Sequence, residues 1–83
     1  MNYKPIYFYE FRDIDTYVKE LNTTVRPKLS AEKQEVFDED IQGLKDEMYW
    51  CCRADMMDFE DTVQEYLQGI RAMVRNMRIK YGS

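Results

Sequence analysis

The chain has 83 residues, of which 12 are basic and 16 acidic, and its formal net charge is −4. This length lies below the roughly 100–200 residues of a typical domain, so we expect one small domain over residues 1–83. The absence of histidine excludes catalysis by a Ser-His-Asp or Cys-His pair and metal binding by imidazole. These counts favour a protein that acts by contact with a partner.

The two cysteines are adjacent, at Cys51 and Cys52. The thiols of neighbouring helical residues point about 100° apart, and a bridge between them would strain the intervening peptide. Two free thiols are typical of a reducing compartment, and the sequence shows neither a signal peptide nor a run of about 18 apolar residues. We therefore expect a cytoplasmic protein with no membrane segment, no metal and no cofactor.

The first apolar pattern covers about residues 5–22 and has the spacing of one helix face. Its members are Tyr7, Phe11, Ile14, Val18 and Leu21. Pro5 suits the first turn of a helix, where its missing N–H would have no partner. Residues 6–11 are also rich in strand-forming side chains, so an N-terminal strand in place of the start of this helix is an alternative.

Two further patterns predict helices over about residues 31–53 and 58–80. Ser30 suits the N-cap of the first of them, and Asp55 or Asp58 suits the N-cap of the second. The apolar positions are Phe37, Ile41, Leu44, Met48 and Cys51 or Cys52, followed by Phe59, Val63, Tyr66, Ile70, Met73 and Met77. The sequence thus predicts an all-α fold, a small three-helix bundle.

The junction between these two helices contains neither glycine nor proline. From Phe37 to Phe59 the chain advances by about six helical turns, so the two apolar faces stay nearly in phase. The alternative is therefore one continuous helix over residues 31–80. Such a helix would have to pair with a second chain in a dimer to bury its apolar face.

A second apolar row lies on the helix at 31–53, away from its predicted core face. Four of its residues recur at intervals of seven: Val36, Gly43, Trp50 and Met57. Glycine allows another helix to approach closely, and tryptophan is the kind of side chain that anchors interfaces. The row predicts either packing on two sides of a central helix or a seam that binds a partner or a second copy of the chain.

Charge divides the chain into an acidic middle and a basic remainder. Residues 32–65 hold twelve acids and three bases, whereas residues 66–83 hold four bases and no acid. Complementarity to helix dipoles explains part of this pattern. The acids Asp38, Glu39 and Asp40 form a group that would suit a basic groove on a partner protein.

Three arginines lie on one flank of the last predicted helix, at Arg71, Arg75 and Arg78. Their spacing of four and three residues forms a row that could follow a phosphate backbone or meet an acidic surface. Three arginines are a small footprint for nucleic acid, and the net negative charge opposes such binding. A small nucleic-acid-associated regulator is therefore the alternative function.

The function that the sequence favours is a non-enzymatic protein-binding module, in a homodimer or a hetero-complex. The sequence contains no phosphate-binding glycine loop, and its spacing does not single out any pair of carboxylates. It therefore gives little support for an enzyme. The residues expected to contact a partner are Val36, Asp38, Glu39, Asp40, Gly43, Trp50 and Met57. A short acidic chain of this kind fits a stoichiometric inhibitor or modulator, as viral accessory proteins often are, acting in a host cytoplasm on a partner such as a nucleic-acid-processing enzyme.

Overall fold

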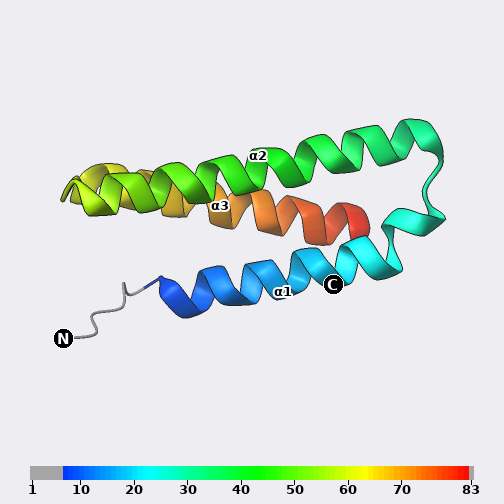
Figure 1. Ribbon diagram of the computed structural model, residues 1–83, viewed down its shortest axis with the longest axis horizontal. Helices are drawn as coiled ribbons and strands as arrows, with labels where there is room; N and C mark the ends of the chain where they lie inside the picture. The colour runs from blue at the N-terminus through cyan, green and yellow to red at the C-terminus, as the bar shows by residue number, and fades with distance from the viewer. Residues whose placement is uncertain (1–6, 83) are drawn as a thin grey trace.

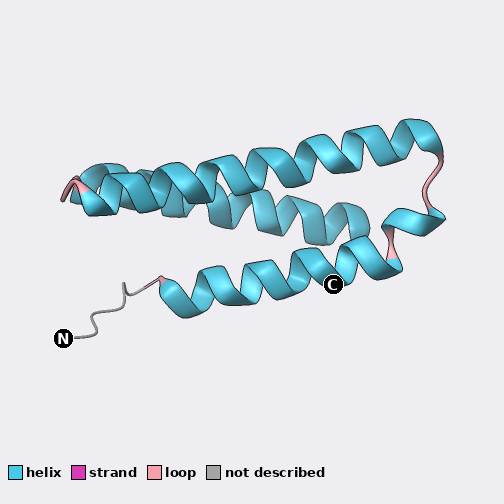
Figure 2. Ribbon diagram, viewed as in Figure 1, coloured by secondary structure: helices cyan, strands magenta, loops and turns pink. Residues whose placement is uncertain are grey.

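The computed structural model describes residues 7–82, which form three α-helices. Helix α1 spans Phe8–Thr24, α2 spans Ala31–Met56 and α3 spans Glu60–Tyr81, with a single 3₁₀ turn at Arg26–Lys28 between α1 and α2. The helices lie side by side and alternate in direction along the chain, as Figure 1 shows. Figure 2 shows no strand within the described part of the chain. The predicted all-α three-helix bundle is confirmed.

Helix α1 begins at Phe8, whereas the sequence pattern placed its start near residue 5; residues 5 and 6 lie outside the described residues. The strand alternative is wrong from Phe8 onward, because the chain is helical there. A lone strand needs a partner strand, and the described residues contain none. Helical spacing instead buries Phe11 and Ile14 on one face.

The chain reverses direction between α2 and α3 within three residues, Met57–Phe59. The backbone N–H of Phe59 donates to the carbonyl oxygen of Ala54 at 2.9 Å, and that of Asp58 donates to Asp55 at 3.0 Å. This pair of bonds is a Schellman motif, which needs a left-handed residue just after the helix. Asp58 takes this conformation, with a φ of 60°, and aspartate tolerates it better than most residues other than glycine.

This reversal rules out the continuous helix over residues 31–80 in the present structure. The predicted caps of α3 are also wrong, since Phe59 occupies the N-cap position and no side chain caps it. The predicted N-cap of α2 is confirmed, because the Ser30 hydroxyl accepts a hydrogen bond from the Lys33 amide at 3.3 Å. Backbone conformation at Asp58, rather than a side-chain cap, separates the two helices.

The helices bury their apolar faces in one core. All five residues predicted for the first helix are buried, and Tyr17 joins them. The residues of the other two helices that are almost completely shielded from solvent are Phe37, Leu44, Cys51, Leu67 and Ile70. Burial of a large aliphatic or aromatic side chain contributes about 1.5–3 kcal/mol. This core therefore supplies most of the free energy that holds the bundle together.

The predicted core face of α3 needs correction. Phe59 is exposed because it lies in the turn, whereas Leu67 and Val74 are buried although the pattern omitted them. Helix α3 contacts both other helices, so its buried face is wider than one narrow stripe. Of the adjacent cysteines, Cys51 faces the core and Cys52 is exposed.

Polar contacts join α1 to the second half of α3. The Tyr17 hydroxyl donates to the carbonyl oxygen of Gly82 at 2.6 Å, and the Arg78 guanidinium lies 5.0 Å from the centre of the Tyr17 ring. Burial raises the pKa of the Tyr17 hydroxyl, so it stays a hydrogen-bond donor across the physiological pH range.

Among the described residues, no helix combines the length and apolar character that crossing a membrane requires.

We expect Asp58→Gly to raise the free energy of unfolding by about 0.5–1 kcal/mol, because glycine adopts the left-handed conformation without a steric penalty. Asp58→Val should lower it by about 1–2 kcal/mol, since a β-branched residue fits this conformation poorly. Urea unfolding followed by circular dichroism measures both changes.

Asp15→Gly, in the exposed middle of α1, is the matched control and should cost about 0.5–1 kcal/mol. An equal loss of stability at both positions would contradict the left-handed turn.

Candidate protein-interaction surface

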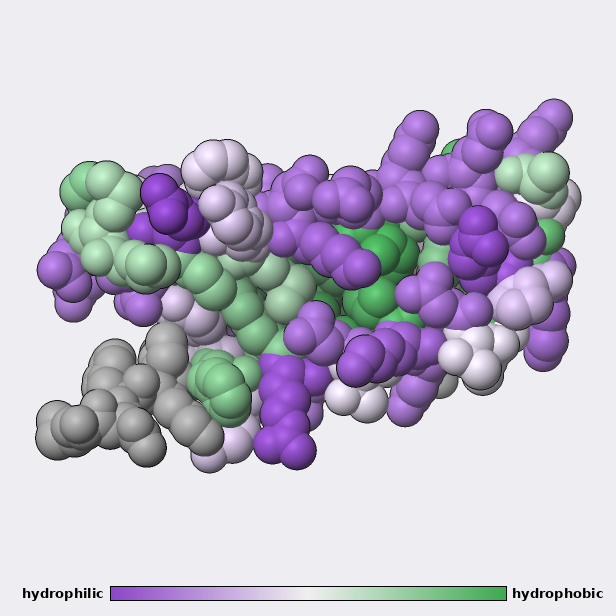
Figure 3. Space-filling view, viewed as in Figure 1, coloured by the Kyte–Doolittle hydropathy of each residue, from purple (hydrophilic) through white to green (hydrophobic). Residues whose placement is uncertain are grey.

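Five large apolar side chains that are at least half exposed gather where α2 turns into α3. They are Tyr49, Trp50, Met56, Met57 and Phe59, and together they are defined as the apex. Trp50 is 53% exposed and Met56 is 75% exposed. In Figure 3, green and near-white atoms gather at this end of the molecule, with purple atoms bordering them. The five residues of the apex thus lie within residues 49–59 and remain more than half exposed.

The lengths of the helices explain why the apex is uncovered. Helix α2 has 26 residues and α1 has 17, so α2 is longer by about 13 Å. Figure 1 shows that α2 and α3 extend past the start of α1 at the end where they are joined. Toward α1, Cys52 and Met56 line a hollow with Phe8 and Phe11, whereas Tyr49, Trp50 and Met57 stay more than half exposed.

Local helix geometry arranges the apex side chains. Tyr49 and Trp50 contact each other edge-to-face, with ring centres 5.1 Å apart and planes at 80°. Met56, the last residue of α2, and Met57, its C-cap, follow them by seven residues, about two helical turns. Arg53 lies between these two pairs of residues along the chain. The inward face of this segment is occupied by Cys51, which leaves the aromatic rings outside.

The apex is embedded in negative charge. Residues 46–61 hold six acids and one base, Arg53, for a formal charge of −5. The acids are Asp46, Glu47, Asp55, Asp58, Glu60 and Asp61. Within residues 7–82 the ion pairs join Arg26 to Asp38, Arg71 to Glu10, and Lys80 to Asp40. None of these pairs includes an acid of residues 46–61, so no residue of 7–82 forms an ion pair with the acids around the apex.

Two of the three acids predicted to face a partner are instead engaged within the molecule. Asp38 accepts two hydrogen bonds of 2.9 Å from Arg26, and this guanidinium lowers the pKa of the Asp38 carboxyl. Asp40 accepts from the Lys80 ammonium at 3.1 Å and from the Tyr81 hydroxyl at 2.7 Å. These acids lie more than two helical turns along α2 from the apex.

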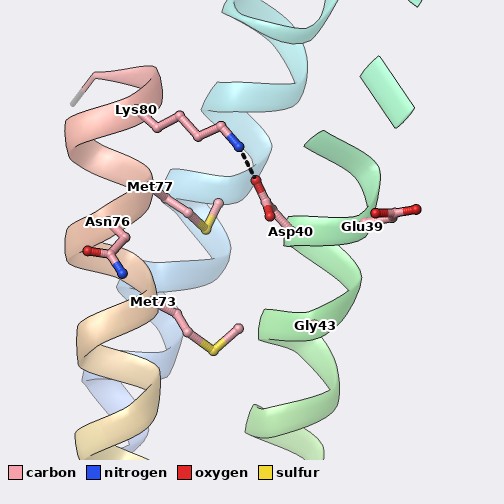
Figure 4. Close-up of a pocket in the computed structure, with 7 residues that line it drawn as sticks. All are labelled: Glu39, Asp40, Gly43, Met73, Asn76, Met77 and Lys80. Carbon is pink, nitrogen blue, oxygen red and sulfur yellow. Dashed lines mark hydrogen bonds and ion pairs between the residues drawn. The ribbon is translucent and has the colours of Figure 1, made fainter. Parts of the chain in front are cut away.

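Gly43 lies on a groove of about 290 Å³ between α2 and α3. Figure 4 shows Met73 and Met77 pointing from α3 toward α2, whereas Glu39 points away from the groove. A Cβ atom on Gly43 would lie 3.5 Å from the Met73 methyl carbon, which is ordinary contact. Gly43 thus packs toward α3, its own chain.

The predicted apolar row is therefore divided by the structure. Val36, Trp50 and Met57 are exposed, whereas Gly43 between them is half-buried. The structure does not bring the row together with Asp38 and the other predicted acids as a single surface.

The predicted arginine row lies along α3, and two of its members hold α1. The Arg71 Nε donates to both carboxylate oxygens of Glu10 at 2.9 Å, and Arg78 lies over the Tyr17 ring. Among the described residues, Arg75 makes neither an ion pair nor a ring contact. Of the three guanidinium groups in this row, only that of Arg75 is therefore not engaged by another described residue.

The residues predicted to contact a partner did not include Tyr49, Met56 and Phe59, which the structure leaves exposed in the apex. Phe59 was assigned to the core because its spacing fitted the last apolar stripe. The available signal was the run of apolar residues near the end of α2, which occupies opposite faces of one helix and cannot all be buried.

The two thiols occupy different environments. The Cys51 thiol is buried and points at the carbonyl oxygen of Val63, 3.9 Å away. Burial raises its pKa to about 11, and the neighbouring Cys52 and Asp55 add to the shift. Burial also raises the pKa of the exposed Cys52. Within the described part of the chain, no three metal-ligating side chains lie together.

Comparison of the chain with protein-family models, with curated proteins and with solved structures finds no match in any of the three.

We expect an aromatic disulfide that reacts with free thiols to modify one thiol per native chain at pH 8. The second thiol should react only after the protein is unfolded in denaturant. The reactive species is the thiolate, so the rate at Cys52 should rise about tenfold per pH unit below its raised pKa. Cys52→Ser should abolish the native reaction. Rapid modification of two thiols in the native protein would contradict the burial of Cys51.

Proposed function

We propose that this chain is a protein-binding module that contacts its partner through the apex and has no catalytic activity of its own. The exposure of two aromatic and two methionine side chains together with Phe59 carries the proposal. Tryptophan and tyrosine are enriched among the residues that dominate binding energy, and methionine adapts to irregular apolar surfaces. A contiguous exposed apolar surface of this kind marks interaction sites on small proteins.

The energetics also favour a partner. Each large apolar side chain gains about 1.5–3 kcal/mol when it is transferred from water to a buried site. The interior of this small bundle has no place for the apex residues, because the inward face of α2 is already filled by Leu44, Cys51 and Ala54. A second protein can supply the burial that the fold itself does not.

The rest of the molecule offers less support for an enzyme. The groove beside Gly43 is bordered by Asp40 and Lys80, which already pair with each other. Burial is the largest cause of the raised pKa values of Tyr7, Tyr17 and Cys51, which pack in the core. Such shifts are expected from burial alone.

A protein that binds without catalysis acts by occupying a surface on its partner. More specifically, we propose that the chain is a stoichiometric inhibitor or modulator, as viral accessory proteins often are. A nucleic-acid-associated regulator has less support, because Arg71 and Arg78 are engaged by α1 residues.

A photo-crosslinking amino acid in place of Trp50 tests the proposal in the cells that produce the protein. We expect a discrete adduct with one other protein. Trp50→Ala should weaken binding of that protein by about 30-fold, the effect of losing a contact worth about 2 kcal/mol.

Ile79 provides the matched control, because it is 80% exposed and lies at the far end of α3. A crosslinker at Ile79 should give no adduct, and Ile79→Ala should leave binding unchanged. An adduct from position 79 with none from position 50 would contradict the apex as the binding surface.

A further inference from the structure

We infer that the apex is received by a basic protein surface, an apolar pocket bordered by lysine or arginine side chains. This inference rests on the proposed function and specifies the chemistry of the partner. The apolar residues of the apex supply contact area, and the acids that surround them determine which surfaces they can approach.

The acids lie on both sides of the apolar residues along the chain. Asp46 and Glu47 precede Tyr49 by less than one turn of α2, and Glu60 and Asp61 follow Phe59 in the first turn of α3. Asp58 lies within the apex turn itself. Four of these five acids are exposed, and Glu47 is half-buried. A protein that buries the apex must therefore place its own rim against carboxylates.

Charge discriminates among the occupants that the sequence left open. A symmetric dimer through the apex would bring two surfaces with a formal charge of −5 into contact. Like charges placed opposite each other at an interface oppose binding. The phosphate backbone of a nucleic acid is repelled for the same reason. A basic protein surface is the occupant that gains from both the apolar area and the carboxylates.

The structure also shows which acids are available for such a partner. Asp38 and Asp40 are neutralised by Arg26 and Lys80 inside the molecule. The acids near the turn form no ion pair with any residue of 7–82. Residues 46–61, which surround the apex along the chain, hold one base, Arg53, against six acids. The acidic contribution to binding therefore comes from the α2–α3 turn rather than from the start of α2.

The single tryptophan of the chain, Trp50, provides a direct optical test because its fluorescence reports on the apex alone. The probe is a synthetic helical peptide with leucines on one face and lysines around it. The comparison probe carries glutamate at every lysine position. We expect the lysine peptide to shift the Trp50 emission to shorter wavelength, and the glutamate peptide to leave it unchanged.

Charge-neutral variants then locate the effect. Asp58→Asn, Glu60→Gln and Asp61→Asn together should weaken binding of the lysine peptide about tenfold, because opposite charges around an interface favour association. The matched control removes three exposed acids at the other end of α2, through Glu32→Gln, Glu35→Gln and Glu39→Gln. It should leave binding close to that of the unaltered protein. Added salt should weaken binding of the unaltered protein, because these charges are exposed.

The possible outcomes separate the two proposals. An equal response to both peptides, or equal weakening by both sets of variants, would overturn the inference about charge and leave the apex as a binding surface. No response of Trp50 to either peptide would overturn the inference and count against the proposed function. A Trp50 shift caused by concentrating the protein alone, with a rise in solution mass, would make a second copy the occupant and overturn the inference. A stronger response to duplex DNA than to the lysine peptide would also overturn it.

Discussion

The chain reversal at Met57–Phe59 is the constraint on which the structure depends. With Asp58 in the left-handed region, α2 and α3 run antiparallel and bury their apolar faces against each other within one chain. Because α2 is longer than α1, the turn lies beyond the start of α1, where Trp50 stays exposed. The turn thus allows the core to form, and the unequal helix lengths leave the apex exposed.

The charges of the molecule separate into those that hold the fold and those that remain available. Arg26, Arg71 and Lys80 each pair with an acid on a different helix or turn. Exposed pairs of this kind contribute about 0–1 kcal/mol each, so they orient the helices more than they stabilise them. The acids near the α2–α3 turn have no such partner within residues 7–82, which leaves the apex end of the molecule negative.

The sequence predicted what depends on local spacing. The apolar stripe of α1, the Ser30 cap and the bounds of the three helices to within a few residues all follow from helical periodicity and capping chemistry. The three-helix bundle was predicted, but the sequence left a continuous helix as the alternative, because Asp58 lacks the turn signal that glycine would give. The partners of Asp38 and Asp40 could not be predicted, because Arg26 and Lys80 approach them only after the helices pack. Of the residues predicted to contact a partner, Trp50 and Met57 are exposed, whereas Asp38 and Asp40 form ion pairs within the molecule.

The distance between spin labels at Val36 and Ile79 tests the reversal most directly. Both positions are exposed, and the labels can be introduced as cysteines in a chain carrying Cys51→Ala and Cys52→Ser, diluted with unlabelled protein. The present structure predicts a short separation, because neighbouring Asp40 and Lys80 contact each other at 3.1 Å and packed helix axes lie about 8–10 Å apart. A separation of about 65 Å, the length of continuous helix between the two positions, would contradict it.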